Sequence, residues 1–159
     1  DRRQRQMCIR DRDYYIKEIA PSVHIPLLVV GNIAEAFQDA TAMPNVHFLG
    51  RVDDLAPYYL QATAVVAPIL SGSGLKTKTV EALRYGKYVI GSAEAFEGIP
   101  ILNYPGAGCE CHNTSDYISL INSLEVAKTN EASLRLFDEQ FSTATQLKRF
   151  SEFIMSTEQ

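Results

Sequence analysis

The sequence lacks an excess of basic residues and a long hydrophobic run, and it has few cysteines. Its 159 residues include 19 acidic and 15 basic side chains, for a formal net charge of −4. Nucleic-acid-binding domains usually carry the opposite excess, so this balance argues against DNA or RNA as a partner. No apolar run approaches the roughly 20 residues that span a bilayer. The three cysteines, Cys8, Cys109 and Cys111, do not make a disulfide framework, so we expect a cytoplasmic protein.

The basic side chains are concentrated at the start of the sequence. Residues 1–12 carry a net charge of +3, against −7 for residues 13–159. A secretory signal peptide would need an apolar stretch directly after these charges, and none follows. The segment has no helical or strand periodicity and resembles a translated sequencing adaptor. We therefore expect residues 1–12 to be a non-native leader and the domain to occupy residues 13–159, although a basic nucleic-acid arm is the alternative interpretation.

Beyond the leader, short apolar runs alternate with helix-like stretches. We expect strands at residues 25–30, 46–49, 64–69, 88–90, 101–103 and 108–112. We expect helices at residues 33–40, 55–62, 75–85, 115–127 and 131–155, with Asp53 and Asp54 as N-cap candidates and a break near Ser142. Alternation at this spacing predicts one α/β domain with a doubly wound, Rossmann-like parallel sheet and C-terminal helices.

The loop Ser71-Gly72-Ser73-Gly74 is the most informative turn. It joins a predicted buried strand to a predicted helix, and ligands of open parallel sheets bind at the carboxyl ends of the strands. The free N–H groups and positive dipole end of a helix N-terminus favour a phosphate. Lys76 and Lys78 add positive charge that the helix dipole disfavours, unless an anion is neutralised there. The alternative interpretation is a flexible turn followed by a solvated helix face.

The predicted helix after this loop has two distinct faces. At 100° per residue, its core face consists of Leu75, Thr79, Ala82 and Leu83. Glu81 falls on the adjoining face with Gly74 and Lys78, where its carboxylate can accept two ribose hydroxyls. The alternative is a weak ion pair between Glu81 and Lys78. Further turns at carboxyl ends of strands occur at Gly31, residues 50–53 and residues 91–98.

Residues 46–99 resemble the C-terminal donor-binding domain of group 1 glycosyltransferases with the GT-B fold. The motifs follow in the family's order: a strand, Gly-x-Val-Asp-Asp at residues 50–54, a helix, and a strand ending at Pro68. A Gly-rich turn then leads into a helix carrying Glu81, followed by Gly86-Lys87 and the Glu97-Gly98 turn. Several motifs in the right order are far more specific than a single Gly-rich loop. Residues 28–31 and the C-terminal helices extend the resemblance weakly.

The resemblance implies an enzyme that transfers a sugar from a nucleoside-diphosphate sugar to an acceptor, without a metal ion or cofactor. Gly50, Arg51 and Val52 would lie against the nucleobase. The N–H groups of Gly74 and Leu75 would face the diphosphate, Lys76 would help to stabilise its charge, and Glu81 would bind the ribose. We assign no catalytic residue. The complete expected donor-binding set is Gly31, Gly50, Arg51, Val52, Ser71, Gly72, Ser73, Gly74, Leu75, Lys76, Lys78 and Glu81.

The sequence also departs from the family pattern. Ser73 stands where the family often has a glutamate that contacts the donor sugar, so the identity of the sugar stays open. The family's basic pair and its N-terminal acceptor-binding domain have no counterpart here, so we expect a fragment that is inactive alone. The resemblance is also compatible with peripheral membrane association through that missing domain.

Two other functions and one other site follow from the same residues. The alternative functions are a nucleotide-sugar epimerase-like domain of the same architecture and a non-catalytic flavodoxin-like binding module. The sequence Cys109-x-Cys111-His112 could suggest a metal site. Its side chains would alternate between the faces of a strand, so we expect two small buried cysteines and a surface histidine.

Overall fold

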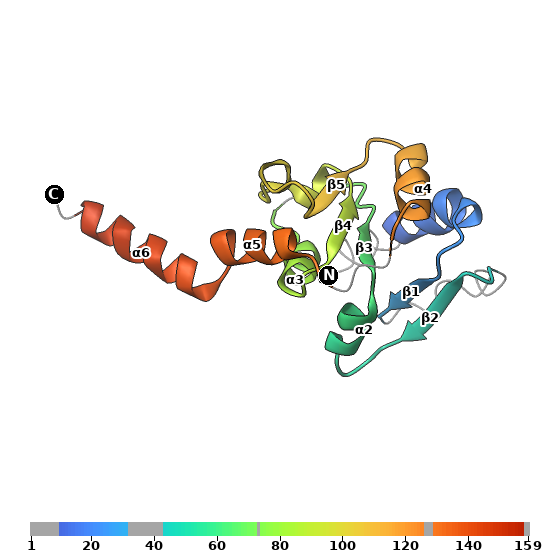
Figure 1. Ribbon diagram of the computed structural model, residues 1–159, viewed down its shortest axis with the longest axis horizontal. Coiled ribbons are helices and arrows are strands. Elements are labelled where there is room, and N and C mark those ends of the chain that lie inside the picture. The colour runs from blue at the N-terminus through green and yellow to red at the C-terminus, as the bar shows by residue number, and fades with distance from the viewer. Residues whose placement is uncertain (1–9, 32–42, 73, 126–128, 158–159) are drawn as a thin grey trace.

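The computed structural model describes residues 10–31, 43–72, 74–125 and 129–157, in which parallel strands alternate with helices (Figure 1). The strands are β1 (Leu27–Val30), β2 (Val46–Gly50), β3 (Ala64–Ala67), β4 (Tyr88–Gly91) and β5 (Gly108–Glu110). All of their pairings are parallel, as connections through intervening helices require. The predicted α/β fold is therefore confirmed.

Hydrogen bonds group these strands into two sheets rather than one continuous ladder. β1 pairs with β2, and β3, β4 and β5 follow one another in the second sheet. Val66 of β3 lies opposite Ile90 of β4, which lies opposite Cys109 of β5. Val29 of β1 and Val66 nevertheless pack against the same hydrophobic cluster. The two sheets thus share a core although no ladder joins them in the described part of the chain.

The main helices are α2 (Ala56–Gln61), α3 (Thr77–Arg84), α4 (Thr114–Asn122), α5 (Glu131–Gln140) and α6 (Thr143–Thr157). Residues 10–14 are also helical and continue into a π-helical turn, Tyr15–Ile19, and a 3₁₀ turn, Ala20–Ser22. Asn113 and Asn130 cap α4 and α5, because their side chains accept hydrogen bonds from Asp116 N and Ser133 N. The predicted break near Ser142 is confirmed between α5 and α6.

One predicted strand is wrong. Residues Ile101–Asn103 form a 3₁₀ turn, closed by a hydrogen bond from Tyr104 N to Ile101 O. Ile101 is buried, whereas Leu102 is 80% exposed, so this short apolar run anchors a turn rather than crossing the core. The predicted helix at residues 33–40 lies outside the described residues.

β4 shows that helices cover both faces of the larger sheet. Its adjacent residues Val89 and Ile90 are both fully buried and belong to different hydrophobic clusters. Val89 packs with residues of α3 and α5, and Ile90 packs with residues of Tyr15–Ile19 and α4. Successive strand residues point to opposite faces, so the sheet is enclosed on both sides, as in doubly wound folds.

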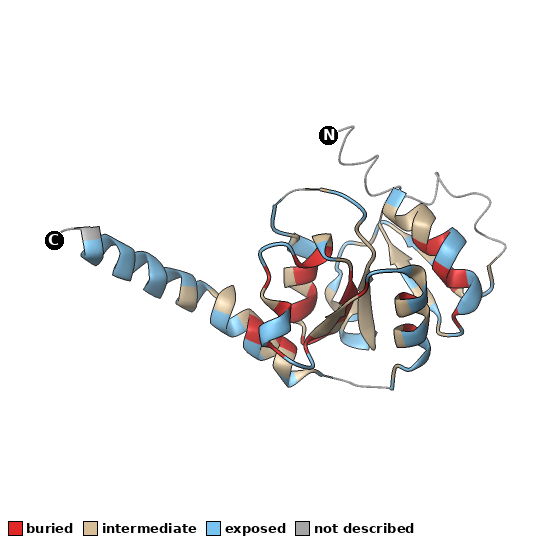
Figure 2. Cartoon of the chain, turned by 90° about the horizontal axis from the view of Figure 1, so that it is seen from above, coloured by how far each residue is buried: buried red, intermediate tan, exposed pale blue. Residues whose placement is uncertain are grey.

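α6 differs from the other helices in its exposure. It extends away from the body of the molecule, and its residues are almost all exposed (Figure 2). Among the described residues, no helix is long and apolar enough to cross a membrane.

Candidate functional site

The predicted phosphate loop lies between the carboxyl end of β3 and the start of α3. Gly72 and Gly74 have φ values of +138° and +85°, which L-residues with side chains rarely adopt. α3 begins at Thr77, and Lys76 at the N-cap makes no side-chain cap to it. The first turn of α3 therefore opens into the glycine loop, and its N–H groups and dipole favour an anion there.

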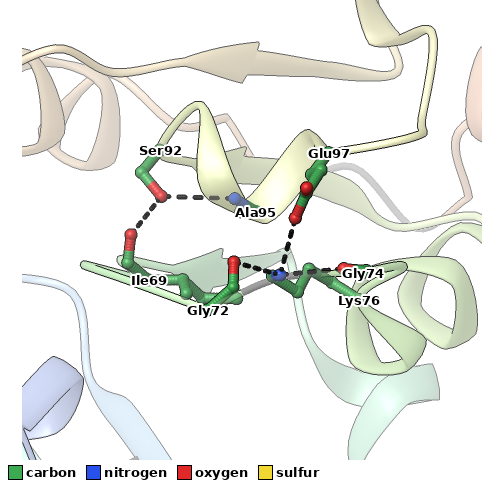
Figure 3. Close-up of polar contacts among 7 residues, drawn as sticks. All are labelled: Ile69, Gly72, Gly74, Lys76, Ser92, Ala95 and Glu97. Carbon is green, nitrogen blue, oxygen red and sulfur yellow. Dashed lines mark hydrogen bonds and ion pairs between the residues drawn. The ribbon is translucent and has the colours of Figure 1, made fainter. Parts of the chain in front are cut away.

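Lys76 is turned into this loop (Figure 3). Its Nζ donates to Gly72 O over 2.9 Å and to Gly74 O over 2.8 Å. The same ammonium forms an ion pair with Oε2 of Glu97 at 3.2 Å. The Lys76 side chain is only 12% exposed. The ammonium thus fixes the shape of the glycine loop and brings positive charge to its inner side.

A second loop, residues 91–98, packs against the first at the end of β4. Ser92 Oγ donates to Ile69 O over 2.5 Å and accepts from Ala95 N at 3.3 Å (Figure 3). A Cβ atom at Gly98 would lie 3.6 Å from Cδ1 of Leu75. The Ser92–Ile69 hydrogen bond and the Lys76–Glu97 ion pair join the two loops at both ends.

Glu81 lies one helical turn into α3, and its side chain accepts a hydrogen bond from a residue of α2. The hydroxyl of Tyr59 donates to Glu81 Oε2 over 3.2 Å, and the Tyr59 ring stacks on Tyr85 with centroids 4.9 Å apart. Burial, and then the neighbouring Glu81 carboxylate, raises the pKa of Tyr59, so its hydroxyl stays protonated and donates. A carboxylate has about four acceptor positions, so Glu81 can accept further hydroxyl groups.

The predicted nucleobase residues lie at the ends of β1 and β2. Gly31 N donates to Gly50 O over 2.7 Å, and Gly50 has a φ of +68°, with no atom of the described residues within 4 Å of the place where a Cβ would be. Arg51 is exposed and Val52 is half-buried. The chain then enters α2, where Asp54 Oδ1 accepts from Ala56 N at 2.9 Å. Because α2 also carries Tyr59, this helix connects the two halves of the predicted site.

The structure confirms most of the predicted core face of α3. Thr79, Ala82 and Leu83 are buried, whereas Leu75 precedes the helix and is 49% exposed, so its assignment to the core was wrong. Lys78 is exposed, as is Ser71, the first residue of the glycine loop. Ser73 lies outside the described residues. The donor-binding roles of the whole set stay predictions.

Tyr59 and Ser92 at this edge were not singled out from the sequence, and Glu97 was recognised only as part of the Glu97-Gly98 motif, with no role in the site. The sequence identifies the turn at residues 91–98 as a strand end, but not its contacts with the loop after β3. Tyr59 and Glu97 reach Glu81 and Lys76 across 22 and 21 positions of sequence. No local pattern predicts such contacts.

The cysteine pair lies on and just after β5. Cys109 is only half-buried, so the expectation of two buried cysteines is wrong for this residue. Cys111 is buried, and burial raises the pKa of its thiol to about 12. His112 is exposed, with Nδ1 3.6 Å from Glu110 Oε1. Within the part of the chain that the structure describes, no group of three or more His, Cys, Asp and Glu side chains could hold a metal ion.

Comparisons with known proteins agree with this architecture. In structure, the chain is similar to a glycosyltransferase from Rickettsia africae ESF-5, with a TM-score of 0.63 and 18% identity over 88% of this chain and 43% of that chain. It is also similar to Anabaena Alr3699/HepE in complex with UDP, with a TM-score of 0.70 and 16% identity. The complex of that protein with UDP-glucose gives a TM-score of 0.66 and 18% identity. Both Anabaena matches cover 91% of this chain and 45% of that chain.

The chain thus spans less than half the length of these solved proteins, and the likeness shows a shared fold. No curated protein matched the sequence. A family model described as "Glycosyl transferases group 1" matches residues 9–124, well over half of the chain. This match includes the glycine loop, α3 and the residues 50–54 motif, and the chain therefore belongs to the group 1 glycosyltransferases.

Proposed function

We propose that this chain is the donor-binding part of a glycosyltransferase and takes a nucleoside-diphosphate sugar. The observation that carries the proposal is the open start of α3, which faces the glycine loop with Lys76 beside it and Glu81 one turn further on. A diphosphate needs several donors and positive charge, and ribose needs an acceptor for two hydroxyls. These requirements are met by adjacent parts of one loop and helix.

Each part has a distinct role in the proposed transfer. The leaving group is a nucleoside diphosphate, whose charge grows as the bond to the sugar breaks. The N–H groups and the dipole of α3 stabilise that charge. The ammonium groups of Lys76 and Lys78 stabilise it further, with no metal ion or cofactor. Glu81 accepts the ribose hydroxyls. Gly50, Arg51 and Val52 form the wall against the nucleobase.

The proposed partners follow from the same assignment. The donor is a nucleotide sugar, and UDP is the first nucleotide to test because the similar Anabaena protein was solved with UDP and with UDP-glucose. The acceptor site belongs to a separate acceptor-binding domain, so this chain alone is expected to bind the donor without turnover. A cytoplasmic location, predicted from the sparse cysteines, belongs to the same proposal.

Calorimetric titration of the chain with UDP, GDP and ADP tests the proposal. We expect at least one nucleoside diphosphate to bind. Glu81→Ala should weaken that binding at least several-fold and leave inorganic pyrophosphate unaffected, since pyrophosphate has no ribose. A sample that is folded by circular dichroism but binds none of the three nucleotides would contradict the proposal. Equal losses of affinity for the nucleotide and for pyrophosphate would contradict the proposal that Glu81 binds the ribose.

A further inference from the structure

We propose that Glu97 is an internal competitor of the donor: its carboxylate holds the ammonium of Lys76 until the donor diphosphate replaces it. This inference rests on the proposed donor site and concerns the regulation of that site. It predicts that the Lys76–Glu97 ion pair and a bound diphosphate exclude each other. Glu97 would then lower the affinity for the donor and return the loop to one fixed shape after the product leaves.

All three N–H donors of the Lys76 ammonium have partners. A lysine has three N–H donors, and Lys76 directs them to Gly72 O, Gly74 O and Glu97 Oε2 (Figure 3). With its side chain 12% exposed, Lys76 has little access to water. A diphosphate arriving at α3 can gain a direct bond from this ammonium only if one of the three partners leaves.

Glu97 is the partner that can leave most easily. Its bond is the longest of the three, at 3.2 Å, and its side chain is 50% exposed, so the released carboxylate returns to water. The other two partners are backbone carbonyls that shape the glycine loop itself. A phosphate oxygen that takes the place of the carboxylate keeps a charge-assisted bond to the ammonium.

The surrounding contacts let Glu97 move without separating the loops. Glu97 follows the 3₁₀ turn Glu94–Phe96 and is exposed. Ser92, at the other end of the same loop, keeps its 2.5 Å hydrogen bond to Ile69 O. Release of Glu97 therefore frees one end of the 91–98 loop while the other end remains attached to the loop after β3.

Titration of Glu97→Gln with inorganic pyrophosphate, and with the nucleoside diphosphate that the unmodified chain binds, tests the inference. Glutamine keeps the size of the side chain and removes its charge. We expect binding to tighten about two- to fivefold, the range for one partly exposed ion pair. Glu94→Gln is the matched control, because it removes the same charge from the same loop. We expect no gain from that variant.

The Lys76→Met variant separates a direct competitor from a general charge effect. In the Lys76→Met background, the Glu97→Gln change should give no further gain, since the ion pair is already absent. A gain that persists in this background, or that equals the effect of Glu94→Gln, would overturn the inference. So would unchanged or weaker binding by Glu97→Gln alone.

A second measurement avoids reliance on variants that fail to fold. During a pyrophosphate titration of the unmodified chain, the side-chain carboxyl ¹³C shift of Glu97 should move with saturation, and that of Glu94 should not. A Glu97 shift that stays constant at saturation would overturn the inference while leaving the proposed function intact. Absence of any pyrophosphate or nucleotide binding by the unmodified chain would instead refute the proposed function, and the inference with it.

Discussion

The hydroxyl of Tyr59 donates a hydrogen bond to Oε2 of Glu81 over 3.2 Å and thereby joins α2 to α3. α2 begins just after the Gly-x-Val-Asp-Asp motif, and α3 follows the glycine loop. One side-chain contact therefore couples the proposed nucleobase wall to the proposed ribose acceptor. The stacked ring of Tyr85 holds Tyr59 in place for this bond.

Tyr59→Phe tests whether this bond orients Glu81. The change keeps the stacking on Tyr85 and removes the donor, so Glu81 gains freedom before the ribose binds. We expect nucleoside-diphosphate affinity to fall about two- to tenfold, which corresponds to the loss of one hydrogen bond. The affinity for pyrophosphate should be unchanged. Tyr58→Phe, on the same helix, is the control and should have no effect. Equal affinities for Tyr59→Phe and the unmodified chain would show that Glu81 needs no support from α2.

Substitution by alanine should have different effects at two glycines, Gly74 and Gly108. Gly74 has a φ of +85°, and no atom of the described residues lies within 4 Å of the place where a Cβ would be, so Gly74→Ala strains the backbone of the loop by roughly 1–2 kcal/mol. At Gly108 a Cβ would collide with the carbonyl oxygen of Val89 within the β4–β5 pairing. We expect Gly74→Ala to weaken pyrophosphate binding in a folded protein and Gly108→Ala to lower the melting temperature more. The reverse order of melting temperatures would contradict the placement of both glycines.

The C-terminal helices should contribute unequally to stability. Leu136 of α5 is fully buried, whereas Phe150 of α6 is 61% exposed. Leu136→Ala should lower the free energy of unfolding by about 2–5 kcal/mol, and Phe150→Ala by less than about 0.5 kcal/mol. Urea unfolding at constant pH measures both. A large loss from Phe150→Ala would mean that α6 packs against the body in solution.

Alkaline pH should destabilise the fold through Cys111. Burial raises the pKa of its thiol from 9.0 to about 12, so the folded protein retains a proton that the unfolded chain releases. The contribution is fully present below pH 9 and is lost as the pH rises towards 12. Urea unfolding between pH 8 and 10 should show a fall in stability that Cys111→Ala reduces. The same slope in both proteins would contradict this assignment, since the buried tyrosines, whose ordinary pKa is 10.0, contribute equally to both.

The sequence predicts features that depend on neighbouring residues and misses those that depend on distant ones. β3, the glycine loop and α3 follow from a short apolar run, flexible glycines and helical periodicity, all local properties. Residues Ile101–Asn103 have the composition of a strand but form a turn, because no neighbouring strand pairs with them in the described structure. The grouping of strands into two sheets depends on pairing across the fold and has no local pattern either.

The same distinction holds for the site. Lys76 and Glu81 were found because they follow a recognisable loop at helical spacing. Their partners Glu97 and Tyr59 come from other elements, and no spacing rule connects them. The sequence therefore predicts which charges are present at the end of the sheet, whereas the structure shows that one lysine is already paired.

A ¹H–¹⁵N correlation spectrum recorded during titration with UDP tests the central claim most directly, because it locates the nucleotide on the chain. The account predicts that the amide shifts at Gly74, Leu75 and the first turn of α3 move with saturation, accompanied by those of Gly50 to Val52 and Glu81. Shifts confined to other parts of the molecule would contradict the assignment of the donor site to this loop and helix.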